Sequence, residues 1–160
     1  MQRFPGEVEA VLRAAGWAEG RSVADAAAEA IRTACAQTTA DGRRYVPFPA
    51  AERALYEFVG VYVDQDGPGV ALRRRPFALD PAMVPPSVAT LAEFGRALGV
   101  GLFPLGVEGV EDAVLVIDEH GRVFALDAGG EWFLGEHVDA ALTTLVTGTA
   151  PPRVRDDGTW

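Results

Sequence analysis

Residues 113–127 read AVLVIDEHGRVFALD and carry the strongest β-signal in the chain. Two runs of mostly apolar, strand-forming residues, 113–118 and 122–127, flank the turn residues Glu119, His120 and Gly121. Glycine readily adopts the positive φ that a tight turn requires. The pattern therefore predicts an antiparallel hairpin.

On the C-terminal side of this hairpin we expect a short strand over residues 132–134 and then an amphipathic helix that Gly148 ends. Its apolar positions recur at helical spacing: Val138, Ala141, Leu142, Leu145 and Val146. Residues 149–160 are rich in Pro, Asp and Gly. The sequence thus predicts a single domain over residues 1–148 followed by a flexible tail over 149–160.

The first third of the chain has the apolar spacing of three helices. The first is expected to begin near Pro5 and end before Gly16, and the third to run from Pro49 to Gly60. The second is expected to start at a capping box of Ser22 and Asp25 and to end near residue 37.

Beyond Gly60 the periodicity changes to that of strands. Residues 61–63 and 70–72 flank the turn-forming sequence DGPG and predict a second hairpin. A Pro-rich connection over 77–86 leads to a fourth helix, with a capping box of Thr90 and Glu93. Residues 101–106 can supply a strand that Pro104 confines to an edge or a bend. This order predicts an α+β fold, a central and mainly antiparallel sheet with helices packed against it.

Composition excludes several classes of function. The 160 residues are 49% hydrophobic and 23% charged, enough for one core without disulfides, and Cys35 is the single cysteine. A net charge of -9 argues against direct binding of nucleic acid or anionic lipid. We see no membrane-spanning apolar run and no signal peptide, so we expect a cytoplasmic protein that does not enter the membrane.

Residues with catalytic chemistry are scarce. Cys35 falls on the apolar face of the second helix, where a buried and inert thiol is expected. Neither histidine has metal-ligand spacing, so we predict no metal site, no cofactor and no catalytic residue. Asp118, Glu119 and His120 resemble a proton-transfer cluster, but their place in the hairpin turn favours a backbone role.

Arg73, Arg74 and Arg75 form the one dense positive cluster in the sequence. Three guanidinium groups can clamp an anion. Solvated charges at the end of a strand are the preferred interpretation.

Acidic residues are concentrated in the last third. Residues 1–106 carry 12 acidic residues and 11 Arg, whereas 107–160 carry 11 acidic residues and 3 Arg. Loops at one or both ends of the sheet should therefore form an acidic rim, which would steer a cationic protein partner. Solubility alone also explains an acidic surface. The predicted partner contacts are Glu108, Glu111, Asp112, Glu119, Glu131 and Glu136.

Several of these landmarks, in this order, resemble the SUKH superfamily of bacterial immunity proteins, relatives of the Smi/Knr and Syd proteins, and particularly its third subgroup. The similar segments span nearly the whole chain: residues 4–17 with Gly20 and Arg21, 54–60, 77–81, 98–106, 115–123, 134–142, and Gly148. One departure is Phe58-Val-Gly60, where the family usually has Phe-Gly-Gly.

The resemblance implies an α+β fold, no catalysis, and neutralisation of a cognate toxin, often a nuclease or a nucleic-acid deaminase. It also implies packing or backbone roles for Trp17, Gly60, Gly106 and Gly121. Nuclease and deaminase toxins are often basic, so acidic loops would imitate the charge of their substrate. The alternative is a cytosolic scaffold or regulatory module of the same superfamily. A third hypothesis is a small hydrolase or ligand-binding protein with a pocket near Arg73 to Arg75 and the Asp118 turn.

Overall fold

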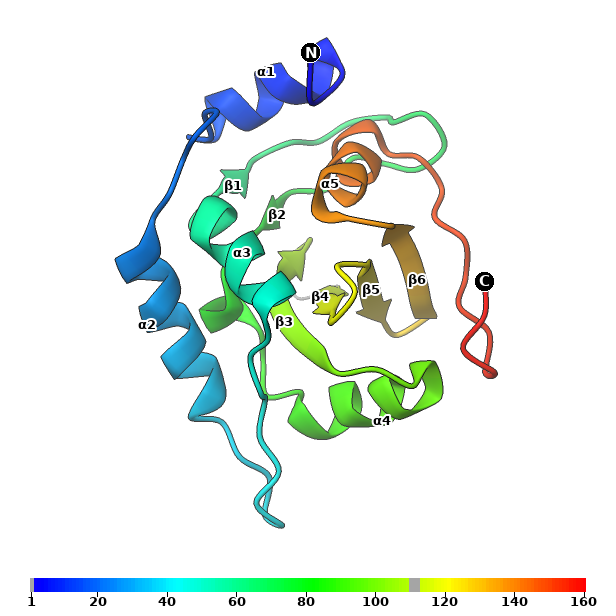
Figure 1. Ribbon diagram of the computed structural model, residues 1–160. Helices are drawn as coiled ribbons and strands as arrows, with labels where there is room; N and C mark the ends of the chain where they lie inside the picture. The colour runs from blue at the N-terminus through cyan, green and yellow to red at the C-terminus, as the bar shows by residue number, and fades with distance from the viewer. Residues whose placement is uncertain (1, 110–112) are drawn as a thin grey trace.

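The computed structural model describes residues 2–109 and 113–160 and has an α+β fold, as predicted (Figure 1). About 35% of the chain is helix and 21% is strand. The helices are α1 (Gly6–Ala14), α2 (Ala24–Cys35), α3 (Pro49–Phe58), the short 3-10 helix η1 (Pro81–Met83), α4 (Val88–Leu98) and α5 (Val138–Thr147). The strands are β1 (Tyr62–Val63), β2 (Phe77–Ala78), β3 (Leu102–Glu108), β4 (Ala113–Asp118), β5 (Val123–Asp127) and β6 (Gly130–Gly135).

The six strands form one antiparallel sheet in which spatial order equals chain order. The predicted hairpin is confirmed, because β4 and β5 pair from Ala113 opposite Asp127 to Ile117 opposite Val123. Gly121 in its turn has a φ of 89°. The predicted strand over 132–134 lies within β6. β4, β5 and β6 thus follow one another both in sequence and in the sheet, and the turns that join them, residues 119–122 and 128–129, are short.

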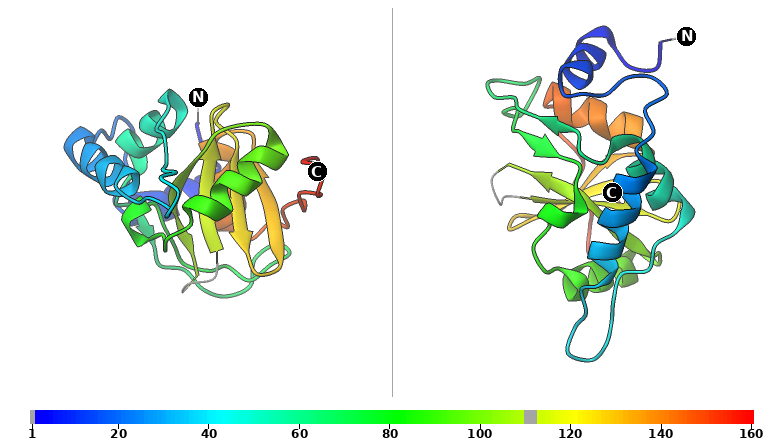
Figure 2. Two further views of the ribbon diagram at one scale, coloured as in Figure 1. Left: turned by 90° about the horizontal axis from the view of Figure 1, so that it is seen from below. Right: turned by 90° about the vertical axis from the view of Figure 1, so that its left-hand side faces the viewer.

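Helices cover both faces of the sheet, and the core lies between these layers. α5 lies on one face, over β5 and β6, and α4 crosses the other face (Figures 1 and 2). α3 packs against β3 and β4, α2 packs outside α3, and α1 lies against α5. Trp17 is 1% exposed and stacks on Phe58, which ties the residues after α1 to α3.

The second predicted hairpin is wrong. β1 pairs with β2, whereas residues 70–72 cap the C-terminal end of α5. The backbone N–H of Val70 donates to the carbonyl of Thr147 at 2.9 Å, and that of Leu72 donates to Gly148 at 2.8 Å. These carbonyls have no partner within the helix and need donors from elsewhere. Val70 and Leu72 are 76% and 50% exposed, so their apolar alternation does not reflect burial in a sheet.

Both predicted capping boxes are also wrong. α2 has Val23 at its N-cap, and the Val23 N–H donates to the carbonyl of Tyr56 at 2.8 Å. α4 begins at Val88, so Thr90 lies inside its first turn instead of at the cap. At α2, a hydrogen bond to α3 is formed in place of the predicted cap. At α4, the helix starts earlier than the predicted capping box.

The strand that contains Pro104 lies inside the sheet order, between β2 and β4, so the expectation of a bend holds and that of an edge does not. The pairing of β3 with β4 is shifted between Pro104 and Gly106. A Cβ atom added at Gly106 would overlap the carbonyl oxygen of Ala78. Glycine is therefore needed where β3 passes the end of β2.

Residues 149–160, for which the sequence predicts a flexible tail, make contacts with the sheet. The N–H of Phe133 donates to the carbonyl of Pro152 at 2.9 Å, and the N–H of Val154 donates to Glu131 at 2.8 Å. Val154 is 4% exposed, and Trp160 stacks on Phe133 with ring centroids 4.5 Å apart. Two apolar residues of this otherwise polar segment, Val154 and Trp160, thus pack the end of the chain against the sheet.

Candidate partner-binding surfaces

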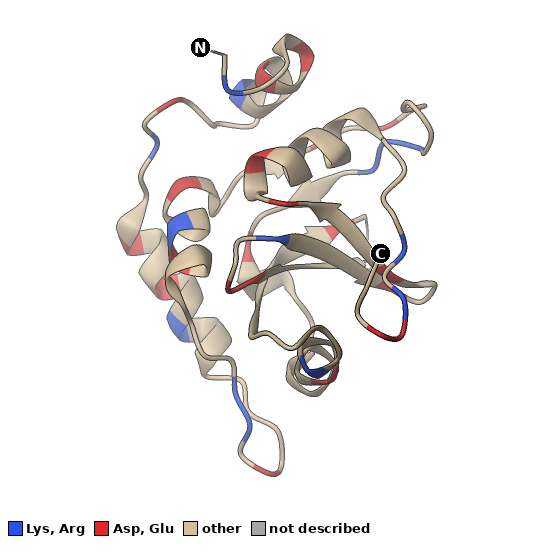
Figure 3. Cartoon of the chain, turned by 45° about the vertical axis from the view of Figure 1, so that its right-hand side comes forward, with Lys and Arg blue, Asp and Glu red and all other residues tan. Residues whose placement is uncertain are grey.

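The four predicted acidic contacts that the structure describes lie at two opposite ends of the sheet. Figure 3 shows the acidic residues of the chain in red. Glu108 ends β3 and Glu131 follows the first residue of β6, so these two share one end. Glu119 follows β4 and Glu136 follows β6, at the other end. Glu111 and Asp112 lie outside the described residues. The structure therefore does not gather the four described carboxylates into one patch.

These four carboxylates also differ in their availability. The side chain of Glu108 is 14% exposed and pairs with Arg75 at 3.0 Å. Glu119 is exposed, and its Oε1 accepts from the backbone N–H of Gly101 at 3.2 Å. Glu136 is exposed and Glu131 is half-buried. Direct contact is therefore easiest at Glu119 and Glu136, whereas Glu108 is held by an arginine.

Asp118 has the backbone role expected of a turn residue. It is fully buried, and its Oδ1 accepts from the N–H groups of His120 and Arg122, each at 2.9 Å. Its Oδ2 accepts from Nε of Arg122 at 2.6 Å. These bonds hold the turn between β4 and β5.

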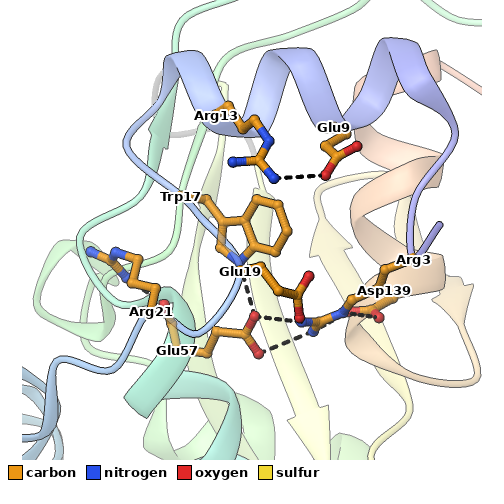
Figure 4. Close-up of polar contacts among 8 residues, drawn as sticks. All are labelled: Arg3, Glu9, Arg13, Trp17, Glu19, Arg21, Glu57 and Asp139. Carbon is orange, nitrogen blue, oxygen red and sulfur yellow. Dashed lines mark hydrogen bonds and ion pairs between the residues drawn. The ribbon is translucent and has the colours of Figure 1, made fainter. Parts of the chain in front are cut away.

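A cluster of charged contacts surrounds Arg3 and joins the N-terminal segment to two helices (Figure 4). Nε of Arg3 donates to Asp139 on α5 at 2.6 Å, and Nη1 donates to Glu57 on α3 at 2.7 Å. The Trp17 indole N–H also donates to Glu57, at 2.9 Å. The bond to Asp139, then that to Glu57, raises the pKa of Arg3 above its ordinary value. The cluster fastens the N-terminal segment to α3 and α5.

The arginine cluster at 73–75 is mostly engaged within the protein. Arg73 pairs with Asp66 at 2.6 Å, and Arg75 pairs with Glu108. Glu108 ends β3 at one end of the sheet, whereas the Asp118 turn is at the other. A single pocket near both clusters, as the third hypothesis required, is therefore not formed.

A cavity of about 390 Å³ lies beneath α5, beside β5 and β6, and we call it the α5 cavity. The residues that line it include Leu72, Ala125, Asp127, Trp132, Leu134 and Leu145. The segment after α5 and the connection between β1 and β2 close its sides. The cavity thus combines an apolar interior with the charged side chains of Arg73, Arg75, Glu108 and Asp127. It lies at the same end of the sheet as Glu131.

Sequence reasoning counted Asp127 among the acidic residues but did not select it as a contact, and it missed Trp132. Asp127 ends β5 and Trp132 lies in β6, and across the turn between them the indole N–H of Trp132 donates to Oδ1 of Asp127 at 3.1 Å. A carboxylate and a tryptophan across a glycine-rich turn were the available signal.

Metal and thiol chemistry receive little support from the described part of the chain. Among residues 2–109 and 113–160, no group of three or more His, Cys, Asp or Glu side chains is placed to hold a metal ion. Cys35 is half-buried against the core, and burial raises the pKa of its thiol. Within the same residues, no helix has the length and apolar character to cross a bilayer.

A family model described as SUKH-3 immunity protein matches residues 4–148. No curated protein and no solved structure matches the chain.

Proposed function

Because this chain belongs to the SUKH-3 immunity protein family, we propose that it binds and neutralises one cognate toxin, a nuclease or a nucleic-acid deaminase. The match over residues 4–148 carries this proposal, since it covers every helix and strand of the fold. The chain would act by forming a stoichiometric complex in the cytoplasm that occludes the toxin. The proposal assigns it no catalytic step.

The acidic surface suits a partner of this kind. Enzymes that act on nucleic acid must approach a polyanion, and a basic toxin would be attracted to a chain with a net charge of -9. The proposed contacts are Glu108, Glu111, Asp112, Glu119, Glu131 and Glu136. Glu119 follows β4 and Glu136 follows β6 at the same end of the sheet, and both are exposed, which supports their part in the encounter.

Co-expression tests the function directly. The product of the neighbouring gene is produced in cells with and without this chain, and growth, co-purification and the activity of that product are measured. Rescue of growth together with loss of activity in the purified complex is the expected result. If only a housekeeping protein co-purifies, and the neighbouring product is not inhibited, the alternative of a regulatory module replaces this proposal.

Charge reversal tests the steering role of the acidic loops. Glu119, Glu131 and Glu136 are changed to Lys together, and the association rate with the toxin is measured between low and physiological salt. The expected result is slower association with a weaker salt dependence. Reversal of Glu7 and Asp25, which are exposed on α1 and α2, is the control. Parental association by the triple variant at low salt would contradict steering.

A further inference from the structure

We propose that the α5 cavity is an anchor site for one lysine or arginine side chain of the partner protein, with Asp127 as the group that binds its charged end. This inference rests on the proposed function, because it takes the partner to be the cognate toxin. Its central residue, Asp127, is not among the acidic contacts predicted from sequence.

The interior of the cavity suits the aliphatic part of such a side chain. Ala125, Leu134 and Leu145 are only 3%, 6% and 5% exposed, and the Trp132 ring adds an aromatic wall. A volume of about 390 Å³ lies within the range of small-ligand pockets and is ample for one long side chain. Lysine and arginine commonly bury their methylene stems against apolar surface of this kind.

The charges that line the cavity leave one carboxylate without a cation. Arg73 is matched by Asp66 at 2.6 Å, and Arg75 is matched by Glu108 at 3.0 Å. Asp127 instead receives two neutral donors on Oδ1, the N–H of Gly129 at 2.8 Å and the indole of Trp132 at 3.1 Å. Across residues 2–109 and 113–160, no ion pair involves Asp127. A cationic group of the partner would form the ion pair that Asp127 lacks.

Other occupants fit these groups less well. An anion would meet the carboxylates of Asp127 and Glu108, and the two guanidinium groups of the lining, Arg73 and Arg75, already have carboxylate partners. A wholly apolar side chain would displace water from Asp127 without replacing its hydrogen bonds, and this is costly. A cation on an aliphatic stem satisfies both the carboxylate and the apolar interior. The Trp132 ring already attracts one guanidinium, since Arg153 lies 5.7 Å from its centroid.

The first test uses n-butylguanidinium chloride as the probe, titrated into the ¹⁵N-labelled full chain. We expect a saturable shift of the Trp132 indole N–H signal, assigned with a Trp132→Phe variant, and no saturable shift with the neutral alcohol n-pentanol. Asp127→Asn keeps an acceptor for Gly129 and Trp132 but removes the charge, and should weaken binding of the probe by at least roughly tenfold. Asp156→Asn is the matched control, because it makes the same change of charge at an exposed residue that lies outside the cavity and is not among the proposed contacts.

The second test uses the toxin identified by co-expression. Asp127→Asn should speed dissociation of the complex by at least roughly tenfold, whereas Asp156→Asn should leave dissociation near the parental rate. Thermal unfolding of both variants checks that they remain folded. If the probe causes no saturable shift, or if Asp127→Asn binds probe and toxin as the parent does, the anchor site is refuted while the immunity function stands. Failure of the parent chain to inhibit the toxin refutes the function instead.

Discussion

The bond between Asp118 and Arg122 should be the most sensitive point of the central hairpin. Asp118→Asn retains Oδ1 as the acceptor for the N–H groups of His120 and Arg122, but it replaces Oδ2 with an amide that faces Nε of Arg122. The substitution therefore removes one charged bond of 2.6 Å and leaves a donor facing a donor. The loss of stability in this variant therefore measures the contribution of the ion pair, separately from that of the hydrogen bonds that hold the turn.

The magnitude follows from burial. Removing one partner of a buried ion pair costs about 3–5 kcal/mol. Asp118 is fully buried but the Arg122 side chain is 24% exposed, so we expect the lower end, about 3 kcal/mol. For a chain of this length that loss lowers the melting temperature by about 6–12 °C.

A double-mutant cycle provides the assay. Asp118→Asn, Arg122→Met and the double variant are unfolded in urea, and the free energies are compared at constant m-value. Arg122→Met also removes a contact with the Trp160 ring, 5.2 Å away, but this loss occurs on both sides of the cycle and cancels. A coupling energy below about 0.5 kcal/mol would refute the reasoning, because the hairpin would then owe its stability to packing alone.

Three further changes test the packing of the fold. Trp160→Ala should destabilise the chain by about 1–2 kcal/mol in urea unfolding, through loss of its stacking on Phe133; an unchanged stability would mean that the chain end is loose in solution. Gly106→Ala should cost about 1–3 kcal/mol, because its Cβ would overlap the Ala78 carbonyl; a parental unfolding midpoint would contradict that close approach. Burial raises the pKa of Tyr45 to about 12, so the folded state favours the neutral phenol; stability present below pH 10 should be lost as the pH rises towards 12. Absorbance titration of the parent against Tyr45→Phe measures this pKa, and a Tyr45 transition at pH 10 would contradict its burial.

Local patterns predicted the elements whose stabilising contacts are close in sequence. The β4–β5 hairpin needs only two strand-forming runs and a turn in which Gly121 has a positive φ. The C-terminal helix needs only its apolar face and Gly148, which has a φ of 70°. The residues that form these contacts lie within about ten positions of one another, so a local sequence pattern is enough to predict them.

Contacts between distant segments were not predictable in the same way. Residues 70–72 alternate as a strand does, but their donors are used by the carbonyls of Thr147 and Gly148. The α5 cavity combines residues from before β2, from β5 and β6, and from the segment after α5. Composition identified the acidic last third, yet only the fold shows that Asp127 and Trp132 lie beside an apolar cavity.

The separation of the acidic residues into two ends bears on how a toxin is met. β4 has six residues, so the ends of the sheet lie about 20 Å apart, more than twice the Debye length of about 8 Å at physiological salt. Each end then acts as a separate patch, whereas at 0.01 M salt the screening length of about 30 Å lets both ends attract a partner.

Two double variants test this separation. One carries Glu119→Gln and Glu136→Gln, and the other carries Asp127→Asn and Glu131→Gln. We expect both double variants to slow association to the same extent at 0.01 M salt. At physiological salt only the pair at the docking end should do so. Because the anchor site requires that end to be the one with Asp127, equal slowing at physiological salt, or slowing confined to Glu119 and Glu136, would contradict it.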